Sequence, residues 1–306
     1  MHRPHSAEYF GVARRYWWNF DFLSLMSSRW RLDSVRRALD VGCGIGHWTM
    51  VLSAFLPIEA EIDGVDREAE WVRVASEATA NAGSPPRVRF QQGEAERLPF
   101  PDESFDMVTC QTLLLHVADP IAVLTEMRRV LHPGGLLALV EPNNVVQSLI
   151  ATSQTSDESV DVILRRVRFQ LMCERGRKAL GEGDFSLGDR VPAMVAKLGF
   201  EELQVFQSDK AFTLVPPYAT EEQETMRREL LRDGSGPAMW PHEDARRYFL
   251  AAEAGTAEEF ERLWTAMEDA KATEVASVEE GAFARPGGRI VYLISARKPL
   301  RPVSEA

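Results

Sequence analysis

Strand-like stretches alternate with segments of helical periodicity through the first half of the chain. The stretches that predict buried strands lie at 38–41, 62–65, 88–91, 105–110 and 136–140. The segments between them that predict helices lie at 48–55, 67–81 and 120–131. Strands and helices that alternate at this spacing predict a parallel sheet that is covered on both faces.

The pattern loosens after residue 144. It predicts helices at 159–180 and 187–198, followed by one or two strands within 200–216. The run 289–296 is rich in Ile, Val and Leu and predicts a closing strand near the end of the chain.

A mostly helical stretch is predicted at 220–278, before that closing strand. Two capping boxes mark helix starts within it, Thr220 with Gln223 and Thr256 with Glu259. Its aromatic and Met side chains either line an apolar pocket or form a helical core. We expect this block to be a helical cap inserted into the main fold.

These patterns predict three parts. An N-terminal helical segment occupies residues 1–33, and the main α/β core occupies 34–216 and 283–300. Within the core, 151–186 is expected to form a partly helical lid. The helical cap insertion occupies 217–282.

Composition narrows the class of protein. The chain has 306 residues, of which 45% are hydrophobic and 26% charged, with a formal net charge of −11. An acidic balance argues against nucleic acid as a partner, because phosphate-backbone binding needs basic stripes. The sequence contains no apolar run of about 18 residues, the length that a membrane span needs. Residues 1–10 lack the apolar core of a signal peptide. We therefore expect a cytoplasmic protein that has no membrane partner and is a monomer or homodimer.

The three cysteines do not predict a metal or disulfide framework. Cys43, Cys110 and Cys173 lie far apart and show no zinc-ligand spacing. No metal is expected.

A glycine loop follows the first predicted strand. Gly42, Gly44 and Gly46 are spaced G-x-G-x-G between a strand and a helix, where glycine permits sharp turns and close ligand approach. The helix N-terminus beyond them suits a carboxylate or phosphate. A dinucleotide fingerprint would require glycine at position 47, which is His47. The loop therefore disfavours a nicotinamide or flavin cofactor.

Polar residues end the next three strands. Asp66 ends the second strand, where an acid can accept from both ribose hydroxyls, although it can also cap the following helix. Glu94 and Ala95 follow the third strand, and Gln111 follows the fourth, although Glu94 can also be a solvated loop acid and Gln111 a strand terminus. The carboxyl ends of parallel strands meet at one edge of the sheet, where open α/β folds bind ligands. The order of these residues predicts a nucleoside site at that edge.

The residues from Arg37 to Asn144 resemble the class I S-adenosylmethionine (SAM)-dependent methyltransferases, particularly the small-molecule branch called type 11. The likeness rests on LDVGCGIG, GVDRE, GEAERLPFPDESFDMV, HVADP and RRVLHPGGLLALVEP. It implies an α/β, Rossmann-like fold with a seven-stranded, mostly parallel sheet and an antiparallel last strand, supplied here by 290–295. The implied cofactor is SAM and the implied product is S-adenosylhomocysteine.

The resemblance also assigns the methionine end of SAM. Gly42, Cys43 and Gly44 would contact the methionine part, and Asp40 would help to position its amino group. Gln111 would face the methionine moiety.

The nucleoside end is assigned in the same way. Asp66 would hold the ribose hydroxyls, and Arg67 would pack beside the adenine. Glu94 would accept from the exocyclic amine of adenine, and Ala95 would donate its backbone N–H to the ring. The family often has Asp at the position of Glu94, and the longer carboxylate should still reach.

Candidates on the acceptor side are fewer. Positioning contributes more to methyl transfer than a base does, about 7–11 kcal/mol against a factor of about 10²–10⁴. His116 is the candidate base, or else orders the loop before the next helix. Asn143 and Asn144 leave the fifth predicted strand, and they either orient an acceptor or form the turn there. Tyr16 or Trp17 is expected to border the site, with the other ring buried structurally.

The leading hypothesis is an enzyme that methylates O or N of a small organic acceptor. One alternative is C-methylation of an apolar quinone- or isoprenoid-like acceptor. A second is a SAM-binding regulator without catalysis, and a dehydrogenase is a more distant third.

Overall fold

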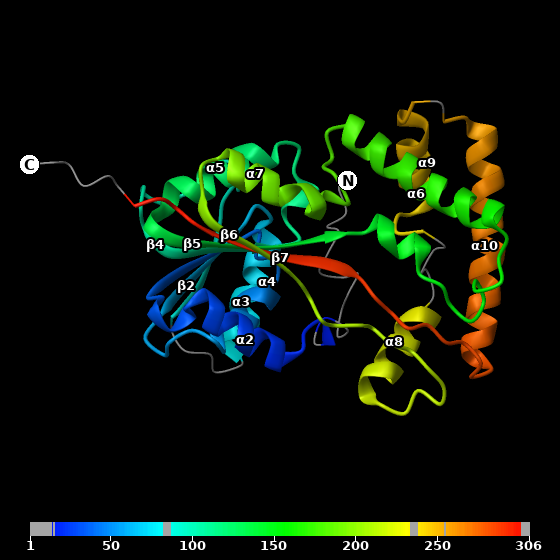
Figure 1. Cartoon of the computed structure of the whole chain (residues 1–306), viewed down its shortest axis with the longest axis horizontal. Coiled ribbons are helices and arrows are strands. Elements are labelled where there is room, and N and C mark those ends of the chain that lie inside the picture. The colour runs from blue at the N-terminus through cyan, green and yellow to red at the C-terminus, as the bar shows by residue number, and fades with distance from the viewer. Residues whose placement is uncertain (1–13, 15, 82–86, 233–237, 254, 301–306) are drawn as a thin grey trace, which may run out of the picture.

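Seven strands form one sheet in the computed structural model, which describes residues 14, 16–81, 87–232, 238–253 and 255–300. Across the sheet the order is β3-β2-β1-β4-β5-β7-β6 (Figure 1). The strands are β1 (Arg37–Val41), β2 (Glu61–Asp66), β3 (Val88–Gln92), β4 (Phe105–Gln111), β5 (Leu131–Asn143), β6 (Glu201–Gln207) and β7 (Ile290–Arg297).

One strand runs against the others. β1 to β5 pair in parallel, whereas β7 is antiparallel to both of its neighbours, β5 and β6. β6 therefore runs in the same direction as β1 to β5. This arrangement confirms the predicted seven-stranded, mostly parallel sheet with an antiparallel last strand.

Helices cover both faces of the sheet (Figure 1). They are α2 (Phe20–Trp30), α3 (His47–Ser53) and α4 (Ala69–Asn81) on one face, and α5 (Pro120–Val130) and α7 (Val191–Lys197) on the other. Alternate side chains of each strand serve the two cores, as the pleat requires. On β5, Ala138 and Val140 pack with the α2–α3 side, whereas Leu137 and Leu139 pack with the α5–α7 side.

β5 begins earlier than the pattern predicted. The Pro133-Gly134-Gly135 sequence, expected as a turn before the strand, lies inside β5. The register of the pairing with β4 shifts there. Phe105 pairs with Leu131, whereas Met107, two residues later, pairs with Leu136. Gly134 has a φ of 78°, so the sequence forms a bulge within the strand.

A helical lobe lies beyond the carboxyl end of β5 (Figure 1). We define it as α6 (Val160–Ala179), α8 (Glu221–Leu231), α9 (His242–Ala251) and α10 (Ala257–Glu279). Thr220 and Thr256 of the two predicted capping boxes form the N-caps of α8 and α10. The Thr220 hydroxyl accepts from the Gln223 N–H at 3.1 Å, and the Thr256 hydroxyl accepts from the Glu259 N–H at 3.2 Å.

The lobe has its own aromatic core. Phe169 of α6 lies 5.7 Å from Phe249, 5.8 Å from Phe260 and 6.2 Å from Trp264 between ring centroids. All four rings are buried. Of the two expectations for the aromatic residues of this region, these rings therefore follow the helical-core one.

The predicted N-terminal segment falls partly outside the described residues. Residues 1–13 and 15 of the predicted N-terminal segment lie outside them. Within the part of the chain that the structure describes, no helix is both long and apolar enough to span a bilayer.

Candidate functional site

The sheet changes the direction of its connections beside β1. The chain steps from β1 to β2 and β3 on one side, and β4 and β5 lie on the other. Such a switch point opens a crevice at the carboxyl edge, where open α/β sheets bind ligands. The glycine loop leaves β1 at this point.

The glycine loop is held against β2 by its backbone. The Gly42 and Cys43 N–H groups both donate to the Val65 carbonyl, at 2.7 and 3.0 Å. Gly42, Gly44 and Gly46 have φ values of 69°, 53° and 81°, which favour glycine. A Cβ on Gly44 would meet no atom within 4 Å, so open space lies beside that residue.

Asp66 ties the end of β2 to the loop. Its Oδ2 accepts from the Gly44 N–H at 2.9 Å, and its Oδ1 accepts from the Glu68 N–H at 2.9 Å. The carboxylate is half-buried. Sequence reasoning weighed a cap role against a ligand role, and the structure gives Asp66 bonds both to the following turn and to the glycine loop.

Asp40 is a buried acid beneath the loop. Its Oδ2 accepts from the Thr49 hydroxyl at 2.5 Å, and its Oδ1 is buried with no hydrogen-bond partner among the described residues. Burial raises the pKa of Asp40 to about 7, with a smaller contribution from the charge of Asp66. The second oxygen is thus a buried acceptor that no described residue satisfies.

The end of β3 presents Glu94 and Ala95 at the same edge. Glu94 is exposed, Ala95 is half-buried, and the Glu94 carbonyl accepts from the Arg97 N–H at 3.1 Å. Arg67 is exposed, pairs with Glu68 at 3.2 Å, and receives the Gln92 amide on its carbonyl at 2.9 Å.

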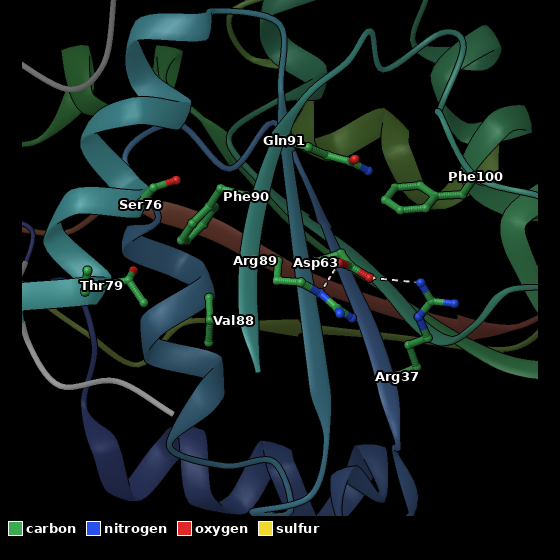
Figure 2. A pocket seen from close by; sticks show the side chains of 10 residues that line it. Arg37, Asp63, Ser76, Thr79, Val88, Arg89, Phe90, Gln91 and Phe100 are labelled. Atoms are coloured by element: carbon green, nitrogen blue, oxygen red, sulfur yellow. Dashed lines mark hydrogen bonds and ion pairs between the residues drawn. The ribbon is translucent and has the colours of Figure 1, made fainter. Parts of the chain in front are cut away.

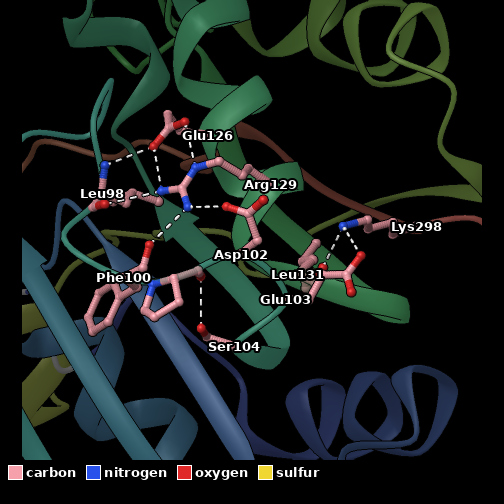
Figure 3. A network of polar contacts seen from close by, with 10 residues as sticks. Leu98, Phe100, Asp102, Glu103, Ser104, Glu126, Arg129, Leu131 and Lys298 are labelled. Atoms are coloured by element: carbon pink, nitrogen blue, oxygen red, sulfur yellow. Dashed lines mark hydrogen bonds and ion pairs between the residues drawn. The ribbon is translucent and has the colours of Figure 1, made fainter.

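Arg129 of α5 fixes the loop that follows Glu94 and Ala95 (Figure 3). Its guanidinium donates to the carbonyls of Leu98 at 3.1 Å and Phe100 at 2.9 Å. It also pairs with Asp102 and Glu126, each at 2.8 Å. The loop that carries the candidate adenine contacts is therefore clamped to a helix.

Gln111 is the last residue of β4, and the loop that follows it at the edge is held by a buried acid. Glu141 is fully buried, and its Oε1 accepts from the Leu113 and Leu114 N–H groups at 2.9 and 2.8 Å. Burial raises the pKa of Glu141 to about 7. Leu113 in turn occupies the space where a Cβ on Gly42 would lie, so this acid sets how the two loops meet.

His116 lies at the end of the same loop, against the helical lobe. Arg177 of α6 approaches His116 Nδ1 at 3.1 Å and donates to the Leu115 carbonyl at 3.0 Å. The ring of Phe185 lies edge-on, with centroids 6.4 Å apart. The imidazole is half-buried at the junction of the sheet edge and the lobe.

Asn143 and Asn144 join the end of β5 to residues 185–189. The Asn143 amide donates to Asp189 at 2.7 Å and accepts from the Val145 N–H at 3.1 Å. The Asn144 amide donates to the Phe185 carbonyl at 2.6 Å. Both side chains are buried, so the structure places their polar atoms in turn-forming bonds.

Tyr16 and Trp17 are both half-buried in the N-terminal segment. The Trp17 ring lies 5.1 Å from the guanidinium of Arg14 and 5.2 Å from that of Arg289. The next residue, Trp18, was not among the candidates and is buried. It packs 5.2 Å from Trp48 of α3.

An open groove of about 640 Å³ lies elsewhere, along the edge strand β3. Figure 2 shows Phe90 turned toward α4 on one side of the strand and Arg89 on the other. Asp63 pairs there with Arg37 at 3.2 Å and with Arg89 at 3.3 Å. The groove is lined by none of the candidate residues.

The structure thus gathers the glycine loop, Asp66, Glu94 and Gln111 along one edge. It adds Thr49, Arg129, Glu141 and Arg177, which sequence reasoning missed. A signal existed for Glu141, an acid directly after an apolar strand. None existed for Arg177, whose partner is 61 residues away. No cluster suited to a metal ion occurs among the described residues.

Comparison with known proteins matches the segment that carries this edge. Residues 39–139 match a family model described as a methyltransferase domain. An uncharacterised methyltransferase of Bacillus subtilis, YcgJ, is 42% identical over 119 residues, which cover 39% of this chain and 46% of that protein. A demethylmenaquinone methyltransferase of Staphylococcus aureus is 42% identical over 105 residues, 34% of this chain and 42% of that protein. The chain spans less than half the length of these curated relatives.

A likeness to a solved structure covers more of the chain. The crystal structure of YcgJ matches with a TM-score of 0.50 and 23% identity, over 92% of this chain and 99% of that one. At this identity the match establishes the shared fold.

Proposed function

We propose that this chain is a SAM-dependent methyltransferase and that it transfers a methyl group from SAM to a small organic molecule, because residues 39–139 match a methyltransferase-domain model. The observation that carries this proposal is the joined pair of Gly44 and Asp66 at the switch point of the sheet. An open glycine loop and a half-buried acid, side by side, suit a ligand that has a ribose and a cationic amino-acid end.

The residues at the edge fit the parts of SAM. The space beside Gly44 would admit the methionine part, and the unpartnered oxygen of Asp40 would accept from its ammonium group. Cys43 and Gln111 would flank the same part. Asp66 would accept from the ribose hydroxyls.

At the far end of the ligand, the clamped loop after β3 would hold the adenine. Glu94 would accept from its amine and the Ala95 N–H would donate to its ring, with Arg67 packed alongside. Arg129 supports this arrangement, because it fixes the carbonyls of Leu98 and Phe100.

The bound cofactor supplies an electrophilic methyl group on a sulfonium, so the chain mainly has to position the acceptor and exclude water. Held in line with the methyl group, an acceptor gains about 7–11 kcal/mol from orientation. We propose that the helical cap insertion 217–282, the lid 151–186 and the described part of the N-terminal segment (residues 16–33) cover the acceptor. Tyr16 and Trp17 belong to that cover.

O- or N-methylation is the preferred reaction. One observation keeps C-methylation of an apolar acceptor as a second candidate, the match to a demethylmenaquinone methyltransferase. The two candidates differ in acceptor and share the cofactor site.

The test is the formation of S-adenosylhomocysteine from SAM, measured across a panel of phenols, amines, carboxylates and quinols. We expect turnover with at least one acceptor and its loss in Asp66→Ala at limiting SAM. Turnover with quinols alone would favour C-methylation. SAM binding without turnover on any acceptor would favour the regulator, and absence of SAM binding would overturn the proposal.

A further inference from the structure

One edge of the sheet has no neighbouring strand. β3 is the first strand in the order across the sheet, and among the described residues it pairs with β2 alone. The register of that pairing is regular, without a bulge. The sequence of β3, Val88–Gln92, contains neither proline nor lysine. Bulges, prolines and lysines are the features that usually protect an edge strand from pairing with another chain, and β3 has none of them.

The bonds to β2 show which backbone groups of β3 face outward. The Ile62 N–H donates to the Arg87 carbonyl at 2.8 Å at one end, and the Gly93 N–H donates to the Asp66 carbonyl at 3.0 Å at the other. In a parallel pair every second residue bonds to the neighbouring strand, so the odd-numbered residues from 87 to 93 face β2. The N–H and C=O groups of residues 88, 90 and 92 therefore face away from it, and no described residue bonds to them.

The two largest side chains of β3 lie against β2 rather than across the open edge. Arg89 pairs with Glu61 at 2.5 Å and with Asp63 at 3.3 Å. The ring of Phe90 fills the space beside Gly64, where a Cβ would lie 2.5 Å from it. Figure 2 shows the two side chains on opposite sides of the strand. Neither side chain therefore obstructs the approach of a further strand.

The groove of about 640 Å³ follows β3 on both of its faces. On one face it is lined by small side chains of α4, Ser76, Thr79 and Ala80, and on the other face by Arg89 and Gln91. Side chains of a strand alternate between the two faces of a sheet. A strand laid along β3 would therefore place side chains into both parts of the groove, and the small side chains of α4 leave room beside that helix.

We propose that β3 pairs in antiparallel orientation with β3 of a second copy of this chain, with Phe90 on the two-fold axis, so that the two sheets become one continuous sheet. Phe90 then lies opposite its own copy, and Val88 lies opposite Gln92. These are the residues whose backbone groups face outward, as hydrogen-bonded antiparallel pairs require. Between them, Arg89 lies opposite Gln91. Such an interface is isologous, because the same residues meet from both sides.

Charge and length favour this register. A two-fold axis at Arg89 would set two Arg89 side chains directly opposite each other, where like charges repel. An axis at Gln91 would leave Val88 beyond the paired segment. With the axis at Phe90, Arg89 meets the neutral amide of Gln91, whose oxygen accepts hydrogen bonds. The sequence of β3 is thus complementary to itself, which favours a second copy over an unrelated strand.

The first test is the mass of the full chain in solution, measured by light scattering after gel filtration over a dilution series. We expect the mass of two chains, which falls toward that of one chain on dilution. A wild-type chain that stays monomeric up to its solubility limit overturns the proposal. The inference goes beyond the proposed function and does not depend on it. A chain that dimerises through β3 and forms no S-adenosylhomocysteine would keep this interface and lose the proposed function.

Val88→Pro tests whether the edge of β3 forms the contact. Proline removes an N–H that faces outward and places its ring there, whereas the backbone groups that bond to β2 stay in place. We expect this variant to be monomeric at concentrations at which the wild type is a dimer. Circular dichroism checks that the variant is folded. A dimer that survives in folded Val88→Pro overturns the proposal.

Val205→Pro is the matched control, at the other edge of the sheet. The Ser208 N–H donates to the Val291 carbonyl at 2.9 Å, and Val205 pairs with Ile294 three residues earlier on β6. The alternation of an antiparallel pair then turns the Val205 N–H outward. We expect Val205→Pro to remain a dimer. Loss of the dimer in Val205→Pro alone would place the contact at β6 and overturn the proposal.

Substitutions at Gln91 test the register and leave the backbone unchanged. Gln91 is exposed, and in the proposed register it meets Arg89 of the second copy at two symmetric positions. Gln91→Arg should raise the dissociation constant of the dimer and Gln91→Glu should lower it, each by about 2–30-fold, from two cross-strand charge pairs. Constants that move in the same direction, or do not move, overturn the proposal. These variants decide the point even if Val88→Pro folds poorly.

Discussion

The carboxylate of Asp66 accepts a hydrogen bond from the backbone N–H of Gly44 at 2.9 Å. The acid at the end of β2 and the glycine loop after β1 are therefore joined by a direct bond across the carboxyl edge of the sheet. We therefore expect a substitution at either residue to alter the position of the other.

Asp66→Ala should weaken SAM binding without unfolding the chain. The variant loses the acceptors for the ribose hydroxyls and leaves the Gly44 N–H unpaired. Loss of such partners costs about 1–3 kcal/mol, a factor of about 5–150 in the dissociation constant. Calorimetric titration with SAM measures this change, and Glu70→Ala, at an exposed position on α4, is the control. An unchanged dissociation constant for Asp66→Ala would remove the ribose role from this residue.

Gly44→Ala and Gly181→Ala form a matched pair. Both glycines have positive φ, 53° and 74°, and a Cβ on either would meet no atom within 4 Å. Each alanine should lower the free energy of unfolding by about 1–2 kcal/mol, from backbone strain alone. Only Gly44→Ala should also weaken SAM binding, because its methyl group enters the proposed ligand space. Equal SAM affinities in the two variants would place the ligand elsewhere.

Glu141→Gln should change how stability depends on pH. Burial raises the pKa of Glu141 from 4.5 to about 7. The folded state therefore binds the proton more tightly than the unfolded chain. The resulting stabilisation is present below pH 4.5 and is lost as the pH rises through 7, an effect of order 3 kcal/mol.

Gln cannot ionise, so Glu141→Gln should gain stability relative to wild type between pH 5 and pH 8. Denaturant unfolding at both pH values measures the difference. Asp40, whose pKa burial also raises to about 7, keeps its own pH dependence in both proteins. Parallel pH profiles of wild type and variant would contradict the assignment, and Glu96→Gln, at an exposed position, is the control.

Arg129→Met should loosen the loop after β3. Its guanidinium bonds two loop carbonyls, those of Leu98 and Phe100, and hydrogen bonds to a charged group contribute about 1.5–3 kcal/mol. We expect faster amide hydrogen exchange over 94–104 and weaker SAM binding. Arg128→Met, at the neighbouring position on α5, should leave that exchange unchanged. Unchanged exchange in Arg129→Met would show that the clamp is dispensable.

The parts that sequence reasoning predicted well depend on local patterns. The strand–glycine–helix run at 40–47 and the N-caps at Thr220 and Thr256 are decided by neighbouring residues, so each was predictable. The bulge at Pro133-Gly134-Gly135 was not, because only the pairing of β5 with β4 and β7 shows that a Pro-Gly-Gly turn lies inside a strand.

The polar supports of the site depend on distant contacts. Arg177 meets His116 across 61 residues, and Glu141 reaches Leu113 across 28. The aromatic residues of the lobe left two roles open at the sequence level, since helical spacing is the same for a pocket wall and for a core. The packing of the folded chain shows that Phe169 lies against both Phe249 and Trp264, as in a helical core.

The central claim is that the carboxyl edge beside β1 binds SAM. Calorimetric titration of the full chain with SAM, and in parallel with NAD, tests it most directly. We predict saturable binding of SAM that is weakened by Asp66→Ala, and no binding of NAD, since His47 stands where a dinucleotide loop needs glycine. Binding of NAD without binding of SAM would contradict the account.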